Sequence, residues 1–242
     1  MRVAVISDIH GNLHALEAAL DQVARERPDA LWCLGDLVGY GPRPNECCEL
    51  VRERADVCLA GNHDLGVLGE LDLDDFAPDA AAAARWTQTV LTEAARDFLA
   101  SLRPKAIQDG AELYHASPRD PVWEYVLSPE AALAALQLTS ERVVLVGHSH
   151  VALAIVVQGD RLRGGAAPAD TDADLSEGRW LLNPGSVGQP RDGDPRAAWL
   201  LLDLKARRAE FRRVAYPIER TQAEIHEEGL AEALAARLSA GV

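Results

Sequence analysis

The chain has no long hydrophobic run and little positive charge. No apolar run approaches the roughly 20 residues that a membrane-spanning helix needs, and no hydrophobic leader segment follows Met1. We therefore expect a soluble, cytoplasmic protein with no membrane partner. The 24 Lys and Arg residues are outnumbered by 38 Asp and Glu, which gives a formal net charge of -14. This charge opposes binding to nucleic-acid backbones, but it does not exclude an anionic substrate, because bound divalent cations reverse the sign of a site.

Cysteine is also scarce, and its spacing excludes two kinds of site. The four cysteines are Cys33, Cys47, Cys48 and Cys58. They form neither a Cys-x-x-Cys metal clamp nor a disulfide framework. We interpret all four as reduced structural thiols. A redox switch at the adjacent pair is the alternative, and a cytosolic setting disfavours it.

The first 150 residues alternate short apolar runs with amphipathic segments. Runs at 3–6, 31–34 and 57–60 predict strands, and apolar residues at helical spacing predict helices over 12–25 and 44–52. This alternation is typical of a parallel sheet with right-handed crossovers. Further helices and strands are expected later in this part of the chain: helices at 78–91, 92–102 and 129–138, and strands at 112–115 and 143–146.

The final third has an antiparallel pattern. Its apolar runs are separated by turn residues and predict strands at 151–158, 161–164, 179–183, 197–203 and 208–215. Segment 164–178 is acidic and rich in small residues, so we expect a mobile loop there, and 218–239 predicts closing helices. The fold class expected is α/β, a four-layer α/β/β/α sandwich with two mixed sheets packed face to face and helices on both outer surfaces. We expect one domain, 1–242, closed by 206–242.

Polar clusters follow the predicted strands, where ligands of α/β sheets usually bind. Zinc, iron and manganese accept mixed imidazole and carboxylate ligands, and the absence of thiolates argues against a structural zinc site. A pair of ions needs a shared carboxylate, and Asp36 is the candidate for it. The clusters are Asp8-Ile9-His10, Gly35-Asp36, Gly61-Asn62-His63-Asp64, His115 and Gly147-His148-Ser149-His150.

In this order, these clusters resemble the five-part signature of the calcineurin-like metallophosphoesterases. The stretch from Asn183 to Arg191 is similar to a segment of the small, stand-alone bacterial and archaeal members. The resemblance implies that His63 acts as general acid outside the metal shell. It also implies seven metal ligands: Asp8, His10 and His150 on the first ion, Asn62, His115 and His148 on the second, and Asp36 between them.

The same resemblance implies a function. It predicts a dinuclear metal-dependent phosphoesterase, preferably a phosphodiesterase, that hydrolyses a small phosphate ester or nucleotide with a metal-bridging hydroxide. The two divalent ions are expected to be manganese, with iron, zinc or nickel as alternatives. Two other functions stay open: a nucleotide or dinucleoside polyphosphate hydrolase, and a non-catalytic metal-binding scaffold for protein partners. A homo-oligomer is also open.

The chain departs from the family pattern beside the bridging aspartate. The family's protein phosphatases carry an aspartate and an arginine three and four positions after it, and here Gly39 and Tyr40 stand there. This disfavours a phosphoprotein phosphatase and removes both the usual partner of the catalytic histidine and a phosphate-binding arginine. Arg43 and Arg191 are candidate substitutes, with solvated loop arginines as the alternative. We expect Asp64 to cap or anchor the segment that follows it.

Overall fold

Two six-stranded mixed sheets form the centre of the computed structural model, which describes residues 1–242. In spatial order, the first sheet contains β3 (Val57–Cys58), β2 (Ala30–Cys33), β1 (Arg2–Ile6), β11 (Ala197–Asp203), β12 (Arg208–Val214) and β9 (Asp172–Asp174). The second sheet contains β4 (Lys105–Gln108), β5 (Ala111–Tyr114), β6 (Val143–Leu145), β10 (Arg179–Asn183), β7 (Leu153–Gln158) and β8 (Arg161–Ala166).

Each sheet has a parallel part, and the two parallel parts position the polar clusters. Strands β1, β2 and β3 are parallel neighbours in the first sheet, and β5, β6 and β10 are parallel neighbours in the second. Parallel strands end at the same edge of a sheet. The loops that follow β1, β2, β3, β5 and β6 therefore meet at one end of the sandwich.

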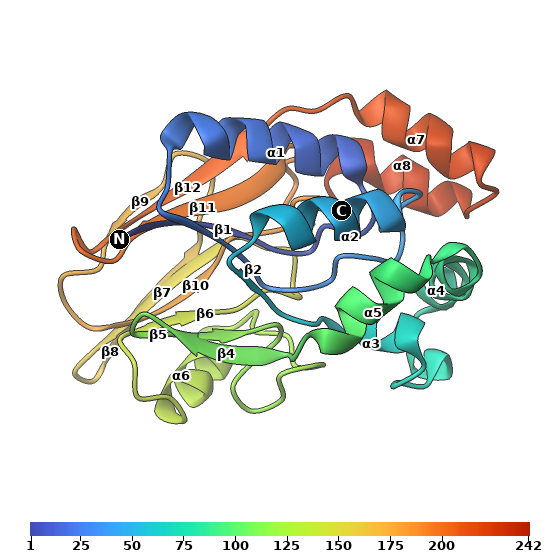
Figure 1. Cartoon of the computed structure of the whole chain (residues 1–242). Coiled ribbons are helices and arrows are strands. Elements are labelled where there is room, and N and C mark those ends of the chain that lie inside the picture. Colours follow the sequence, from blue (N-terminus) through green and yellow to red (C-terminus); the bar gives the residue numbers. More distant parts are fainter.

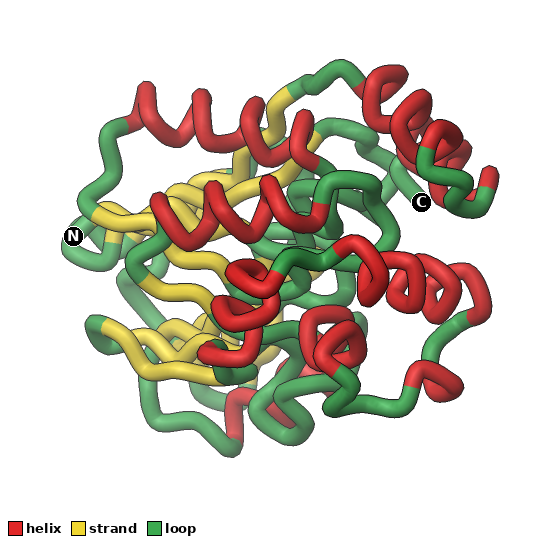
Figure 2. The backbone as a smooth tube through the Cα atoms, turned by 45° about the vertical axis from the view of Figure 1, so that its right-hand side comes forward, coloured by secondary structure: helices red, strands yellow, loops and turns green.

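Helices cover both outer surfaces of the sheets, as predicted. Figure 1 shows α1 (Leu13–Glu26) and α2 (Pro44–Arg54) over the first sheet and α6 (Pro129–Gln137) below the second. Figure 2 shows the strands grouped between these helices. None of the helices combines the length and apolar character needed to cross a membrane. The other helical elements are α3 (Asn62–Leu68), the 3₁₀ helix η1 (Leu73–Asp75), α4 (Pro78–Val90), α5 (Glu93–Ser101), α7 (Ile218–Glu227) and α8 (Glu232–Ala240).

The apolar layer between the sheets fixes how their ends meet. Trp32 and Phe211 of the first sheet belong to the same buried cluster as Leu113, Leu145 and Leu182 of the second. Burying a large apolar side chain contributes about 1.5 to 3 kcal/mol. This layer therefore holds the two sets of strand ends against each other, although they are far apart in sequence.

The expectation of a mobile loop over 164–178 was wrong. Strand β8 continues to Ala166, and β9 pairs with β12, with Ala173 opposite Ala209. Within β9, Ala173 is buried while Asp172 and Asp174 are exposed. This is the alternation of a half-buried strand, but its buried residue is too small to give a hydrophobic signal. The segment carries the chain from the second sheet to the first.

Strand β4 was also missed. Its residues alternate between exposed and half-buried, and it pairs only with β5 at the edge of the second sheet. An edge strand has one unpaired side and little burial, so its sequence carries a weak pattern. The interpretation of 1–242 as one domain stays a prediction.

Candidate metal centre

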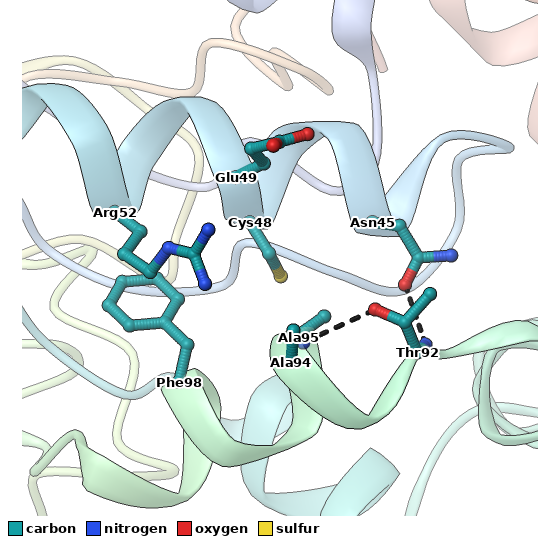
Figure 3. Close-up of a pocket in the computed structure, with 8 residues that line it drawn as sticks. All are labelled: Asn45, Cys48, Glu49, Arg52, Thr92, Ala94, Ala95 and Phe98. Carbon is teal, nitrogen blue, oxygen red and sulfur yellow. Dashed lines mark hydrogen bonds between the residues drawn. The ribbon is translucent and has the colours of Figure 1, made fainter.

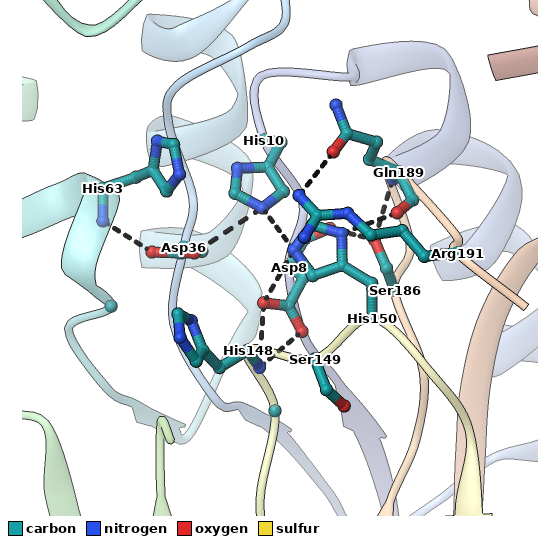
Figure 4. A network of polar contacts seen from close by, with 12 residues as sticks. Asp8, His10, Asp36, His63, His148, Ser149, His150, Ser186, Gln189 and Arg191 are labelled. Carbon is teal, nitrogen blue, oxygen red and sulfur yellow. Dashed lines mark hydrogen bonds and ion pairs between the residues drawn. The ribbon is translucent and has the colours of Figure 1, made fainter. Parts of the chain in front are cut away.

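The polar clusters meet in one buried centre at the end of the sandwich (Figure 4). One group contains Asp8, His10, Asp36 and His150, and another contains Asp36, His115 and His148. Within each group, candidate ligand atoms lie within 4.8 Å of one another. Asp36 belongs to both groups. The seventh predicted ligand, Asn62, begins α3 and lies with its Oδ1 3.2 Å from His115 Nε2.

The backbone of the centre is held in conformations that side chains rarely adopt. Non-glycine residues with φ in the left-handed region are uncommon, and each costs on the order of 1 to 3 kcal/mol. Their concentration here indicates that the surrounding fold, and not the local sequence, orients these side chains. Six such residues belong to the centre or its wall: Asp8, His10, Asp36, Tyr40, His148 and His150.

The imidazoles of His10 and His150 face each other in a way that requires a cation. His10 Nδ1 lies 3.1 Å from the carbonyl oxygen of Val38, and His150 Nδ1 lies 2.6 Å from that of Gln189. A carbonyl oxygen only accepts hydrogen bonds, so Nδ1 carries the proton in both rings. Burial lowers the pKa of both histidines well below its usual value, so both rings are neutral. Their Nε2 lone pairs, 3.0 Å apart, then point at each other, and a shared cation relieves this repulsion.

Backbone carbonyl groups also orient the histidines of the second group. His115 Nδ1 donates to the carbonyl oxygen of Leu34 at 2.9 Å, which leaves Nε2 as a lone-pair donor. His148 Nε2 lies 3.2 Å from the carbonyl oxygen of Trp123, so Nδ1 is its free nitrogen. Backbone carbonyls thus select the imidazole nitrogen that each ring offers, as is usual for metal-binding histidines.

Asp36 lies between the two groups. Its Oδ1 accepts a hydrogen bond from the backbone N–H of His63 at 2.9 Å. Its Oδ2 is buried without a hydrogen-bond partner, 3.5 Å from His10 Nε2 and 3.5 Å from His115 Nε2. An unpaired buried carboxylate oxygen is costly. Two cations, one on each side, satisfy this atom, and the donor set therefore fits a dinuclear centre.

The electrostatics of the centre lead to the same conclusion. Burial raises the pKa of Asp8 to about 7 and that of Asp36 well above its usual range, and it lowers the pKa of His115 and His148 to about 3. These shifts disfavour the carboxylate anions, because the protein supplies little positive charge there. Divalent cations stabilise the anionic carboxylates and bind neutral imidazoles. The site is therefore matched to ions that carry the missing charge.

His63 lies beside both groups without belonging to either. Its Nδ1 is buried and has no hydrogen-bond partner. Aromatic contacts hold the ring: its centroid lies 4.5 Å from Tyr40, 4.9 Å from His10 and 5.2 Å from Phe76. Gly39 has a φ of +84°, and a Cβ at this position would collide with His63 Nδ1. Contacts with aromatic rings and with the backbone of Gly39 therefore hold the His63 ring. They take the place of the aspartate that the family's protein phosphatases have at the position of Gly39.

The two candidate arginines have different surroundings. Arg43 Nε donates to Glu224 Oε2 of α7 at 2.9 Å, so Arg43 is an anchor between the loop and this helix. Arg191 lines the cavity beside the metal centre. Its Nη2 donates to Gln189 Oε1 at 2.8 Å and to Tyr40 Oη at 3.3 Å, while its buried Nε has no partner. Of the two, only Arg191 lines this cavity.

Asp64 caps the start of α3, as expected, and it also anchors an earlier loop. Its carboxylate accepts hydrogen bonds from the backbone N–H groups of Asp36 (2.9 Å), Leu37 (2.9 Å), Val38 (3.2 Å) and Gly61 (2.9 Å). These residues precede Asp64 in the chain. The side chain therefore holds the loop that carries Asp36 against the start of α3.

Asn183 has a similar supporting role. Its Nδ2 donates to the carbonyl oxygen of Gly147 at 2.8 Å and to Ser149 Oγ at 3.0 Å. It therefore fixes the loop that carries His148 and His150. Like Asp64, it is buried, and its Oδ1 accepts a hydrogen bond from the N–H of Gly185 at 2.9 Å.

A cavity of about 220 Å³ opens beside the metal centre. Four of its lining residues are aromatic: Tyr40, Phe76, Trp123 and Tyr125. The loop after Gly35, which contains Tyr40, and the segment Leu65 to Phe76 were expected to influence substrate choice. Trp123 and Tyr125 were given no functional role, because they lie in a loop without a recognisable spacing. The one available signal was indirect, since aromatic residues make up only 5% of the chain.

A second cavity, of about 250 Å³, lies between α2 and α5 (Figure 3). Its lining includes Asn45, Glu49, Arg52 and Thr92. No group of potential metal ligands occurs there. This cavity, which we call the α2–α5 groove, has no part in the candidate centre.

Comparison with known proteins identifies the family. Residues 1–207 match the calcineurin-like phosphoesterase superfamily domain. The chain belongs to this superfamily. It is 43% identical to a metallophosphoesterase from Sphaerobacter thermophilus of known crystal structure, with a TM-score of 0.90 over 100% of this chain and 99% of that one. It is also 39% identical to an uncharacterised protein of Methanocaldococcus jannaschii, over 99% of this chain and 98% of the relative.

Two other similarities are weaker. A hypothetical protein from Pyrococcus horikoshii has the same fold, with a TM-score of 0.82 at 21% identity over 100% of this chain and 98% of that one. A symmetrical bis(5'-nucleosyl)-tetraphosphatase from Erwinia tasmaniensis is 42% identical over 71 residues. That match covers 28% of this chain and 26% of the tetraphosphatase.

Proposed function

We propose that this phosphoesterase-family chain is a dinuclear metal-dependent phosphodiesterase. The observation that carries the proposal is Asp36, whose unpaired Oδ2 lies 3.5 Å from an imidazole of each ligand group. One ion would be held by Asp8, His10 and His150, and the other by Asn62, His115 and His148. Manganese suits this imidazole and oxygen donor set, and iron, zinc and nickel are the alternatives. When bound, the two ions supply a nucleophile at neutral pH and stabilise the charge on the transferred phosphoryl group.

Arg191 would bind a phosphoryl oxygen in the cavity beside the metal centre. Its guanidinium group is oriented by Gln189 and Tyr40, and its Nε retains an unused donor. Charge-assisted hydrogen bonds of this kind are worth about 1.5 to 3 kcal/mol. The family's protein phosphatases have an arginine where Tyr40 stands, and its absence here disfavours a phosphoprotein substrate.

His63 would protonate the leaving oxygen. Burial, together with the positive charge of Arg191, lowers its pKa to about 3 in the absence of substrate. A bound phosphoryl anion offsets the charge of Arg191 and so favours the protonated ring. Aromatic packing around the ring fixes its direction, which a proton donor requires.

A second candidate is hydrolysis of nucleotides or dinucleoside polyphosphates. The 71-residue similarity to a symmetrical bis(5'-nucleosyl)-tetraphosphatase favours it. Both candidates use the same metal centre and differ in the group attached to the phosphate.

The test is turnover of two diesters by manganese-loaded protein. Bis(p-nitrophenyl) phosphate releases a phenolate that leaves without a proton, whereas diphenyl phosphate needs protonation. We expect His63→Ala to slow diphenyl phosphate hydrolysis by about 10² to 10⁴-fold and the nitrophenyl ester much less. His14→Ala is the control, because His14 pairs with Glu224 outside the centre.

Two outcomes contradict the proposal. If His63→Ala slowed the hydrolysis of both diesters equally, this would contradict the role of His63 as general acid. No turnover of either ester with manganese, iron, zinc or nickel, in protein shown to bind the metal, would favour the non-catalytic scaffold instead.

A further inference from the structure

One wall of the cavity beside the metal centre is aromatic. Phe76 follows η1, and Trp123 and Tyr125 belong to the loop between β5 and α6. The Phe76 and Trp123 rings meet edge to face with centroids 4.9 Å apart. The Tyr125 ring stacks on His148 with centroids 4.2 Å apart and an angle of 14° between the planes. These three side chains form what we call the aromatic wall.

The aromatic wall is held in place by its backbone. Asp120 Oδ1 accepts hydrogen bonds from the N–H groups of Val122 at 3.0 Å and Trp123 at 3.1 Å. The carbonyl oxygen of Trp123 accepts one from His148 at 3.2 Å. The loop is therefore tied both to itself and to His148, so the rings are held in a fixed position beside the metal centre.

The exposure of Tyr125, in the aromatic wall, is not explained by packing alone. Tyr125 is 48% exposed, although a ring of this size is normally covered in a protein interior. Neither its hydroxyl group nor the indole N–H of Trp123 is hydrogen-bonded to the protein. One face of the Tyr125 ring lies on His148, and the residue lines the cavity. Exposed rings of this kind at a cavity are typical of sites that stack planar ligands.

We infer that Trp123 and Tyr125 form a stacking subsite for a nucleobase carried by the phosphate ester that the metal centre hydrolyses. This inference rests on the proposed function and assigns its substrate class. The cavity of about 220 Å³ is smaller than the range of about 300 to 1,000 Å³ usual for drug-sized ligands. It suits a phosphoryl group with one adjoining ring and is too small for a folded peptide segment. The net charge of -14 opposes a nucleic-acid strand, so the substrate is a small nucleotide.

The experiment compares two ligands that differ only in the base. Binding of AMP and of ribose 5-phosphate to the manganese-loaded full chain is measured by calorimetry and by inhibition of diester hydrolysis. Base stacking on an aromatic side chain predicts that AMP binds about 10- to 100-fold more tightly. Tyr125→Ala should reduce this ratio, the double variant Trp123→Ala/Tyr125→Ala should bring it near one, and Tyr125→Phe, which keeps the ring, should preserve it. Leu127→Ala is the matched control, since Leu127 is 55% exposed and lies outside the cavity lining.

The ratio separates stacking from a structural role. If Tyr125 only positions His148, Tyr125→Ala weakens both ligands equally and the ratio is unchanged, which overturns the inference. Equal affinity for the two ligands in the unaltered protein overturns it as well. Failure of the proposed function is distinguishable, because it appears as absent turnover, while calorimetry still reports whether the base is recognised.

Discussion

Two of the cavities in the chain have nearly equal volumes, and only one of these two has the chemistry of a site. The α2–α5 groove measures about 250 Å³ and the metal-centre cavity about 220 Å³. In the groove, polar atoms satisfy one another: Thr92 Oγ1 accepts from the N–H of Ala95 at 3.3 Å, and Asn45 Oδ1 accepts from the N–H of Thr92 at 2.8 Å (Figure 3). These contacts begin α5 and join it to α2. The α2–α5 groove is therefore a packing contact between these two helices.

The metal-centre cavity has the opposite character. Its polar atoms are buried, and three of them lack a partner: Asp36 Oδ2, His63 Nδ1 and Arg191 Nε. Buried polar groups are normally hydrogen-bonded, so unpaired ones that converge on one cavity indicate an absent ligand. Whether the polar lining atoms have hydrogen-bond partners, and not the volume of the cavity, therefore distinguishes a functional site from a packing contact.

The largest expected difference between the two cavities concerns their carboxylates. Asp36→Asn removes the shared charge while keeping the oxygen that accepts from His63, so the fold should survive. We expect diester turnover to fall by about 10³-fold or more, since metal ions contribute several kcal/mol to transition-state stabilisation. Glu49→Gln in the groove should leave turnover unchanged. Steady-state kinetics of both variants test the comparison, and equal activities would break it.

A smaller difference in diester hydrolysis is expected between variants of the arginines in the two cavities. Arg191→Ala should lower kcat/KM for the diester by about 10- to 100-fold through the loss of a charge-assisted hydrogen bond. Arg191→Lys should recover part of it, because the positive charge stays. Arg52→Ala, the matched change in the groove, should have no effect. A loss of activity in Arg52→Ala as large as that in Arg191→Ala would contradict the assignment of Arg191 to phosphate.

The smallest effect is expected in the groove itself. Thr92→Ala removes the N-cap of α5 and should cost about 1 kcal/mol of unfolding free energy. Turnover at a temperature where the protein is folded should not change. Urea unfolding and diester kinetics on the same preparation measure both quantities. A loss of activity without a loss of stability would show that the groove communicates with the metal centre.

The sequence was most informative where strand ends carry polar residues. Apolar runs such as Val143 to Val146 predicted strands, and parallel pairing then required the residues after them to meet at one edge. Asp8, Asp36 and His148 were predicted together on this basis, and the structure brings them together. The four free cysteines also agree with the prediction of structural thiols.

The remaining features depend on contacts that no local pattern records. Tyr40 stands where a family arginine was expected, and its packing on His63 requires Gly39 to leave room for the ring. Asp64 caps α3, as predicted, but it also holds a loop 26 to 28 residues away, and this second role could not be predicted from its neighbours. The aromatic wall combines Phe76 with Trp123, which lie on separate segments and meet only after the sheets pack.

The most direct test of the account is the metal content of the protein after manganese loading. We expect two manganese ions per chain with an exchange-coupled electron paramagnetic resonance signal, because Asp36 would be a ligand shared by both ions. Asp36→Asn should abolish the coupling and reduce the bound metal to one ion or none. One ion per chain in the unaltered protein, or two uncoupled ions that Asp36→Asn leaves in place, would contradict the dinuclear centre.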